Sequence, residues 1–147
     1  MAEIAVSVDI ARPPDEVWAD VRDIASHVTW MADAAEIRFV TERTEGVGTR
    51  FECDTRVGPL RTTDVMEITA WDEGRRMGVL HQGLVTGSGD FSLRPLDGGG
   101  TRFEWREDLR FPWWFGGPLG EQVARPLLRA VWRRNLGRLK QRLETAR

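Results

Sequence analysis

Glu107 is the residue of this 147-residue sequence whose type and position most clearly suggest chemistry. It lies in "TRFEWREDLRF", residues 101 to 111, where alternate side chains of a strand point to opposite faces. The apolar face of that strand holds Phe103, Trp105, Leu109 and Phe111. Glu107 has the same parity, and a carboxylate among such neighbours has to be paired, reach solvent at a cavity mouth, or have a raised pKa.

His81 is the second ionisable side chain that we expect to point inward. In "MGVLHQ" it shares its parity with Met77 and Val79. General acid–base catalysis needs such groups within hydrogen-bond reach of a substrate, so Glu107 and His81 are the candidate catalytic residues. The alternative is structural, with Glu107 paired with an arginine at a cavity mouth and His81 packed in the wall.

The other side chains that could be reactive, Cys53 and His27, give weaker indications of a catalytic role. Cys53 is the only cysteine and has no base beside it in the sequence, so we expect a small core residue. His27 is expected at the surface or as a helix cap. These two separated histidines and one cysteine do not make a zinc ligand set, and the glycine stretches "EGVGT" and "TGSG" do not continue as nucleotide-binding motifs. We therefore expect no metal and no cofactor.

Hydrophobic periodicity predicts the elements that position these residues. Residues 3 to 10 alternate as a half-buried strand, and two short helical segments follow, the second ending near Trp30. Residues 35 to 111 are divided by regularly spaced turns, which predicts an antiparallel meander. Parity fails at Val65 and Met66, which suggests a bulge there and leaves the direction of Asp64 open.

A long amphipathic helix is predicted over residues 118 to 147 because apolar residues recur there at 3.6 residues per turn. Pro126 lies inside this segment and should kink the helix or split a short preface from it. Strands followed by a long helix indicate an α+β domain in which a curved sheet covers the apolar face of the helix. The glycines of "TGSG" either make room for a bulky group or mark a bend.

A bent sheet that does not close fully onto a helix leaves an apolar pocket, which is how small-molecule sites are usually lined. Trp113, Trp114 and Phe115 occur where the last strand turns into the helix, so we expect them at the rim or lid of this pocket. The predicted ligand-binding residues are Trp30, Phe51, Cys53, Thr55, Phe91, Trp105, Trp113, Trp114, Phe115, Leu127, Leu128 and Val131.

The sequence resembles the START-like helix-grip superfamily, and within it the bacterial polyketide cyclase/dehydrase and lipid-transport-like branch. The likeness rests on "PPDEVWADVRDIASHVTWM", on "GTRFEW" in the last strand and on the long final helix. It implies a curved seven-stranded antiparallel sheet around a long C-terminal helix, with two short helices after strand one. It also implies a hydrophobic ligand between sheet and helix. Only some members of the superfamily are enzymes, and the resemblance transfers no catalytic residue.

Composition limits the other classes of function. The length fits one domain, residues 1–147, and the net charge of -2 gives no general attraction to nucleic acid. A lone cysteine fits a reducing cytoplasm, and no apolar run is long enough to span a membrane. The expected partner is a small hydrophobic molecule, polycyclic, polyketide-like or lipid-like.

Two alternatives to a ligand carrier remain open at this point. One is a cyclase or dehydratase that uses Glu107 as acid or base. The other is a module whose basic C-terminal helix, with seven Arg and one Lys in residues 121 to 147, docks a membrane surface or a partner protein. The aromatic segment around Trp113 is equally compatible with a homodimer contact.

Overall fold

The computed structural model describes residues 2–145. The chain begins with strand β1 (Ala2–Ile10), helix α1 (Pro14–Val21) and the 3-10 helix η1 (Ile24–Thr29). Six strands follow: β2 (Ala34–Phe39), β3 (Arg50–Val57), β4 (Leu60–Asp72), β5 (Arg76–Gln82), β6 (Thr86–Pro95) and β7 (Thr101–Arg110). A short 3-10 turn, η2 (Trp113–Phe115), leads into helix α2 (Gly117–Thr145).

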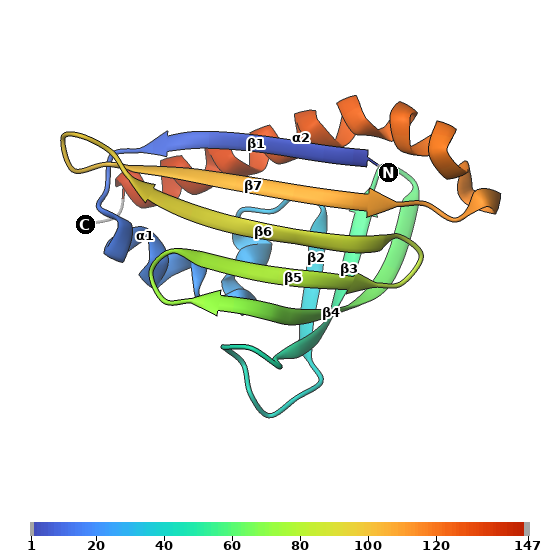
Figure 1. The fold of residues 1–147 in the computed structure, drawn as a ribbon, viewed down its shortest axis with the longest axis horizontal. Coiled ribbons are helices and arrows are strands. Elements are labelled where there is room, and N and C mark those ends of the chain that lie inside the picture. Colours follow the sequence, from blue (N-terminus) through green and yellow to red (C-terminus); the bar gives the residue numbers. More distant parts are fainter. Residues whose placement is uncertain (1, 146–147) are drawn as a thin grey trace.

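The seven strands form one antiparallel sheet in the order β1-β7-β6-β5-β4-β3-β2. The sheet curves, and α2 runs along its inner side across β1 and β7 (Figure 1). The predicted α+β helix-grip architecture, with seven strands and two short helices after strand one, is confirmed.

Local sequence explains how these elements form. In β1, Ile4, Val6 and Ile10 are buried and Val8 is partly buried on the same face, while the residues of the other parity face outward, as the alternation predicts. Helix α1 starts at Pro14, whose missing N–H costs nothing in a first turn. Gly116 has a φ of 94°, a conformation open mainly to glycine, and it turns the chain from η2 into α2.

Strand register differs from the expectation at one place. Met66 pairs regularly with both Phe51 and His81, so no bulge occurs at Val65 and Met66. The register shift lies between Ile68 and Ala70 instead. Val65 is half-buried on the opposite face, which is why the apolar pair misled the parity argument.

Helix α2 is unbroken from Gly117 to Thr145, so the predicted split at Pro126 is wrong, and a kink there stays a prediction. Pro126 and Gln122, the residue whose carbonyl loses its bond to the proline, are both exposed. Water can therefore replace the missing hydrogen bond, which lowers the cost of an internal proline.

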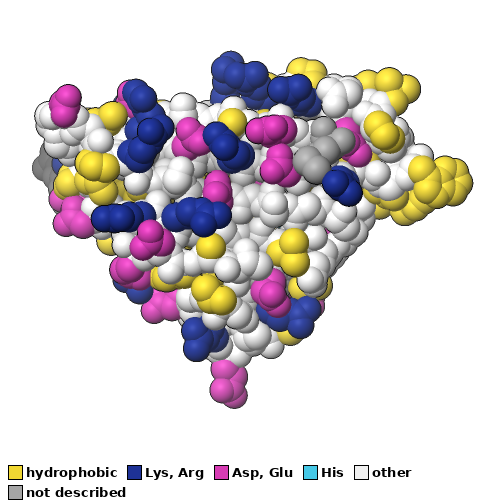
Figure 2. Space-filling model, viewed as in Figure 1, with side chains coloured by type: hydrophobic (Ala, Val, Ile, Leu, Met, Phe, Trp, Pro, Cys, Tyr) yellow, Lys and Arg dark blue, Asp and Glu magenta, His cyan; other side chains and the backbone are white. Residues whose placement is uncertain are grey.

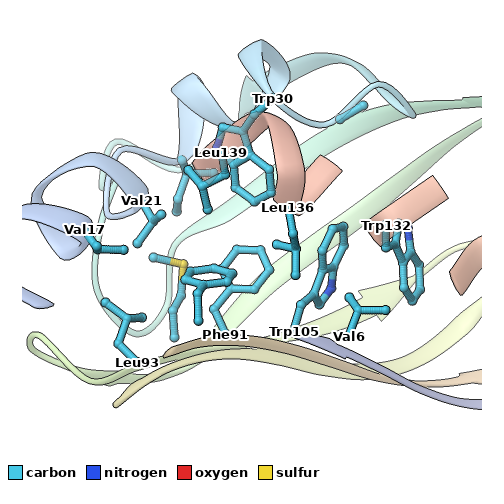
Figure 3. Packing of buried hydrophobic residues seen from close by; sticks show 14 of the residues in the cluster. Val6, Val17, Val21, Trp30, Phe91, Leu93, Trp105, Trp132, Leu136 and Leu139 are labelled. Atoms are coloured by element: carbon cyan, nitrogen blue, oxygen red, sulfur yellow. The ribbon is translucent and has the colours of Figure 1, made fainter. Parts of the chain in front are cut away.

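The C-terminal half of α2 closes the main core. Leu136 and Leu139 are at most 1% exposed and lie close to Trp30, which reaches in from the end of η1 (Figure 3). Trp30 packs against Phe91 and Phe103 of the sheet, with ring centroids 5.9 and 6.3 Å away. This end of the space between sheet and helix is therefore filled by aromatic rings.

Candidate functional site

A cavity of about 300 Å³ lies between the curved sheet and the N-terminal half of α2. The sheet contributes inward residues from neighbouring strands, including Phe51 of β3, Met66 of β4 and Val79 of β5. Ala124 and Leu128 of α2 form part of the opposite wall. Before Trp132, the buried residues of α2 are Gly117 and Glu121, so this half of the helix does not fill the space against the sheet.

Two stacked tryptophans lie beside α2 where the hollow meets the filled end. The rings of Trp105 in β7 and Trp132 in α2 lie 4.7 Å apart with an angle of 21° between their planes. Both face the cavity, and Figure 3 shows Trp105 between Leu136 and Trp132, with Val6 below the two rings. An offset stack of this kind ties the helix to the sheet beside the open space.

Glu107 points inward as predicted and is 5% exposed. One of its carboxylate oxygens lies 2.7 Å from His81 Nε2, and the other accepts a hydrogen bond of 2.9 Å from the Trp105 indole N–H. All three residues line the cavity. The alternative pairing of Glu107 with an arginine is wrong, because its partners in the described part of the chain are His81 and Trp105.

The pairing changes the protonation of His81. Burial alone disfavours the charged imidazolium, but the Glu107 carboxylate, with a smaller contribution from Asp64, outweighs it and raises the pKa of His81. The pair therefore favours an imidazolium next to a carboxylate. Such a pair can give a proton to one atom of a ligand and take one from another.

Gly89 of β6 explains how the Glu107 carboxylate fits against the sheet. A Cβ at Gly89 would overlap the carboxylate atoms of Glu107, so a side chain there would displace Glu107. At Gly87 a Cβ would collide with the Asp108 carbonyl. Of the two explanations offered for the "TGSG" glycines, close approach by another group is therefore correct.

Asp64 is an inward carboxylate whose direction the sequence left open. It is 7% exposed and lines the cavity. Its oxygens accept hydrogen bonds from the Thr62 hydroxyl at 3.2 Å and from the Leu84 backbone N–H at 3.2 Å. Asp64 thus holds the β5–β6 turn against β4. The regular pairing of Cys53 with Asp64 would have revealed its direction if the bulge had not been misplaced.

Asp33 is a second carboxylate that sequence reasoning missed. It precedes β2 and accepts hydrogen bonds from the Trp132 indole at 3.2 Å and from the Asn135 amide at 2.7 Å. Asn135 is fully buried and also accepts the Ala32 N–H at 3.0 Å. These bonds fasten α2 to the η1–β2 segment at one side of the cavity.

His27 contradicts the prediction of a surface or capping residue. It is 6% exposed, lines the cavity and lies 2.7 Å through Nε2 from the Val21 carbonyl. Burial lowers the pKa of His27, and the hydrogen bond to Val21 opposes this shift only in part. His27 is therefore held neutral among the rings of Trp30 and Phe91.

Cys53 is buried, as expected of a small core residue, and it also faces the cavity. Burial raises the pKa of its thiol to about 11. The thiol is therefore protonated at neutral pH and is not an activated nucleophile.

The predicted ligand-binding residues divide into two groups. Those that line the cavity are Phe51, Cys53, Thr55, Phe91, Trp105, Phe115, Leu127 and Leu128. Trp30 belongs to the filled core, and Val131 packs partly against that core. Leu127 is 54% exposed, so it lies at the edge of the cavity where the helix meets solvent.

Trp113 and Trp114 point away from the cavity, with exposures of 86% and 63%. Leu119 and Val123 on the first turns of α2 are also exposed. Figure 2 shows hydrophobic side chains gathered at the end of the molecule where α2 begins. A homodimer contact at this end stays a prediction. In residues 2–145 no helix is both long and apolar enough to cross a bilayer.

Comparison with known proteins shows which family the chain belongs to. A family model described as polyketide cyclase / dehydrase and lipid transport matches residues 1–144. The chain belongs to this family. The resemblance inferred from the sequence is thereby confirmed. A comparison with curated proteins found no match for this polyketide cyclase/dehydrase family member.

Solved structures similar to this family member share its fold. The protein TTHA0849 from Thermus thermophilus has a TM-score of 0.79 at 20% identity, with 96% of each chain covered. The Zhui aromatase/cyclase from Streptomyces sp. R1128 has a TM-score of 0.71 at 19% identity, covering 97% of this chain and 90% of that one. DR_A0006 from Deinococcus radiodurans has a TM-score of 0.63 at 21% identity, covering 93% and 99%.

Proposed function

We propose that this protein binds a small hydrophobic molecule in the cavity between the sheet and α2. The observation that carries the proposal is an apolar hollow of about 300 Å³ bounded by Phe51, Met66, Val79 and the Trp105–Trp132 stack. Ligand sites are typically concave, mostly apolar and provided with a few polar groups. The bonded pair of Glu107 and His81 supplies such groups here.

The energetics suit a ligand of moderate affinity. Burial of about 200 Å² of apolar ligand surface contributes roughly 5 kcal/mol before the costs of association are subtracted. The preformed aromatic wall lowers the ordering cost, because Trp105 and Trp132 are already held by hydrogen bonds to Glu107 and Asp33. Affinity in the micromolar range is the expected result.

The test uses N-phenyl-1-naphthylamine, a neutral dye that fluoresces in apolar sites. The wild-type protein should bind it saturably at one site. Val79→Phe places a ring into the hollow and should weaken binding at least tenfold, whereas Leu80→Phe, which adds the same ring on the opposite face of β5, should not. Absence of saturable binding, or equal binding by both variants, contradicts the proposal.

A second candidate function is acid–base catalysis by the same site. It is favoured by the buried contact of 2.7 Å between His81 and Glu107, whose carboxylate faces the cavity. The structurally similar Zhui protein is an aromatase/cyclase. If this protein turns over a polyketide substrate, Glu107→Gln should abolish turnover while dye binding persists. Unchanged turnover in Glu107→Gln removes the catalytic role.

A further inference from the structure

The charged residues that line the cavity are mostly acidic. Asp33, Asp64 and Glu107 line it, whereas the Asp90 carboxylate lies on the outer face of β6, where it pairs with Arg76 at 2.9 Å. Within residues 2–145, no lysine or arginine belongs to the lining. His81 is the nearby group that carries positive charge, and it is already bonded to Glu107.

The remaining carboxylates are held by neutral donors. Asp64 accepts hydrogen bonds from Thr62 and Leu84, and Asp33 accepts them from side chains of α2. In the described part of the chain, neither forms a salt bridge. Each carboxylate oxygen can accept more than one hydrogen bond, so these two lining carboxylates retain capacity for a donor from the ligand. The walls therefore offer acceptors and negative charge in an apolar setting.

On the basis of the proposed binding function, we propose that the cavity selects ligands that carry hydrogen-bond donors and no negative charge. Alcohols, phenols and amines on an apolar body fit this description. Their polar end lies toward Asp64 and the His81–Glu107 pair, and their apolar body lies against Phe51, Met66 and Val79. Carboxylates, phosphates and sulfonates are excluded.

The physical reason is the weak screening inside the cavity. A ligand anion placed about 6 Å from a carboxylate that forms no salt bridge, at an effective dielectric constant of about 20, is disfavoured on the order of 100-fold. The anion would also lose water without gaining a cationic partner. A hydroxyl or ammonium group finds acceptors already oriented by Thr62 and Leu84.

The test compares two dyes with the same ring skeleton. N-phenyl-1-naphthylamine is neutral, and 8-anilino-1-naphthalenesulfonate carries a sulfonate on that skeleton. We expect the wild type to bind the neutral dye at least 30-fold more tightly, on the order set by the repulsion above. Asp64→Asn should reduce the ratio of the two dissociation constants several-fold. The control Asp108→Asn removes the same charge from the opposite face of the sheet and should leave this ratio unchanged.

A second measurement needs no variant. Decylamine and decanol should displace the neutral dye from the wild type, while decanoate should not. The inference on charge is overturned if the sulfonate dye binds as tightly as the neutral dye or more tightly. It is also overturned if decanoate displaces the neutral dye as effectively as decanol does. Neither result contradicts the proposed binding function. If neither dye binds, the proposed function itself is contradicted and this inference falls with it.

Discussion

The two ends of the space between sheet and helix have opposite construction. At one end Leu136 and Leu139 of α2 meet Trp30, and the interior is solid. At the other end Leu127 and Leu128, on the same helix, face a hollow. The two halves of α2 therefore differ in role. The C-terminal half stabilises the fold, and the N-terminal half borders the candidate site. The stacked tryptophans mark the boundary between them.

The largest expected effect contrasts the two ends directly. Leu139→Ala removes a fully buried side chain from the solid end and should lower the free energy of unfolding by about 2–5 kcal/mol. Leu128→Ala, at the half-buried edge of the hollow, should cost less than about 1.5 kcal/mol because little packing is lost. Urea denaturation measures both values. Equal losses would mean that the two halves of α2 are not distinct.

Removing the Glu107 charge should have the next largest effect. Glu107→Gln leaves His81 without its carboxylate and should lower the free energy of unfolding by about 1–3 kcal/mol at pH 6. Glu104→Gln is the matched control on the outer face of β7, where its contact with Arg106 is partly exposed, and it should change stability by less than about 0.5 kcal/mol. A cost as small as that of the control would show that the buried pair contributes nothing.

The sequence has two histidines, so an NMR titration resolves both imidazoles. The pKa of His81 is raised and that of His27 is lowered. His81 therefore stabilises the fold fully below about pH 6.5, and this contribution is lost as the pH rises through its folded pKa. His27 acts in the opposite sense, because its neutral folded form costs stability as the pH falls below about 6.5.

Glu107→Gln gives that titration its control. It should lower the pKa of His81 and leave that of His27 unchanged, since the partner of His27 is the Val21 carbonyl. If Glu107→Gln shifted the pKa values of both histidines in the same direction, the different environments assigned to them would be contradicted.

The smallest effect is expected at the exposed aromatic pair. Trp113→Ala and Trp114→Ala should each change the free energy of unfolding by less than about 0.5 kcal/mol, because these rings make few contacts within one chain. Analytical ultracentrifugation alongside the denaturation tests the predicted homodimer. A dimer that dissociates in Trp113→Ala supports a contact between copies at this surface, and a monomeric wild type removes it.

Much of the fold followed from period-two patterns in the sequence. The strand alternation around Phe103 and Trp105 was long and regular, so the inward direction of Glu107 was predictable. The parity of "MGVLHQ" likewise brought His81 to the same face, and the structure joins the two by a hydrogen bond. These successes share one cause, since alternation fixes which face a side chain occupies.

The missed residues depend on contacts between distant parts of the chain. His27 is buried because η1 folds onto Phe91, more than sixty residues later, and a short helical stretch gives no local sign of this. Asp33 becomes part of the site through Trp132 and Asn135. Asp64 was undetermined because Val65 and Met66 are both apolar. Periodicity identified which face of each strand points inward, but tertiary packing decided which residues line the hollow.

The indole N–H signals of the protein test the central claim, that ligand occupies the hollow rather than the outer surface. Seven tryptophans give seven such signals. Saturation with N-phenyl-1-naphthylamine should shift the signals of Trp105 and Trp132 and leave those of Trp113 and Trp114 unchanged. Shifts confined to Trp113 and Trp114, with Trp105 and Trp132 unmoved, would place the ligand outside the cavity and contradict the account.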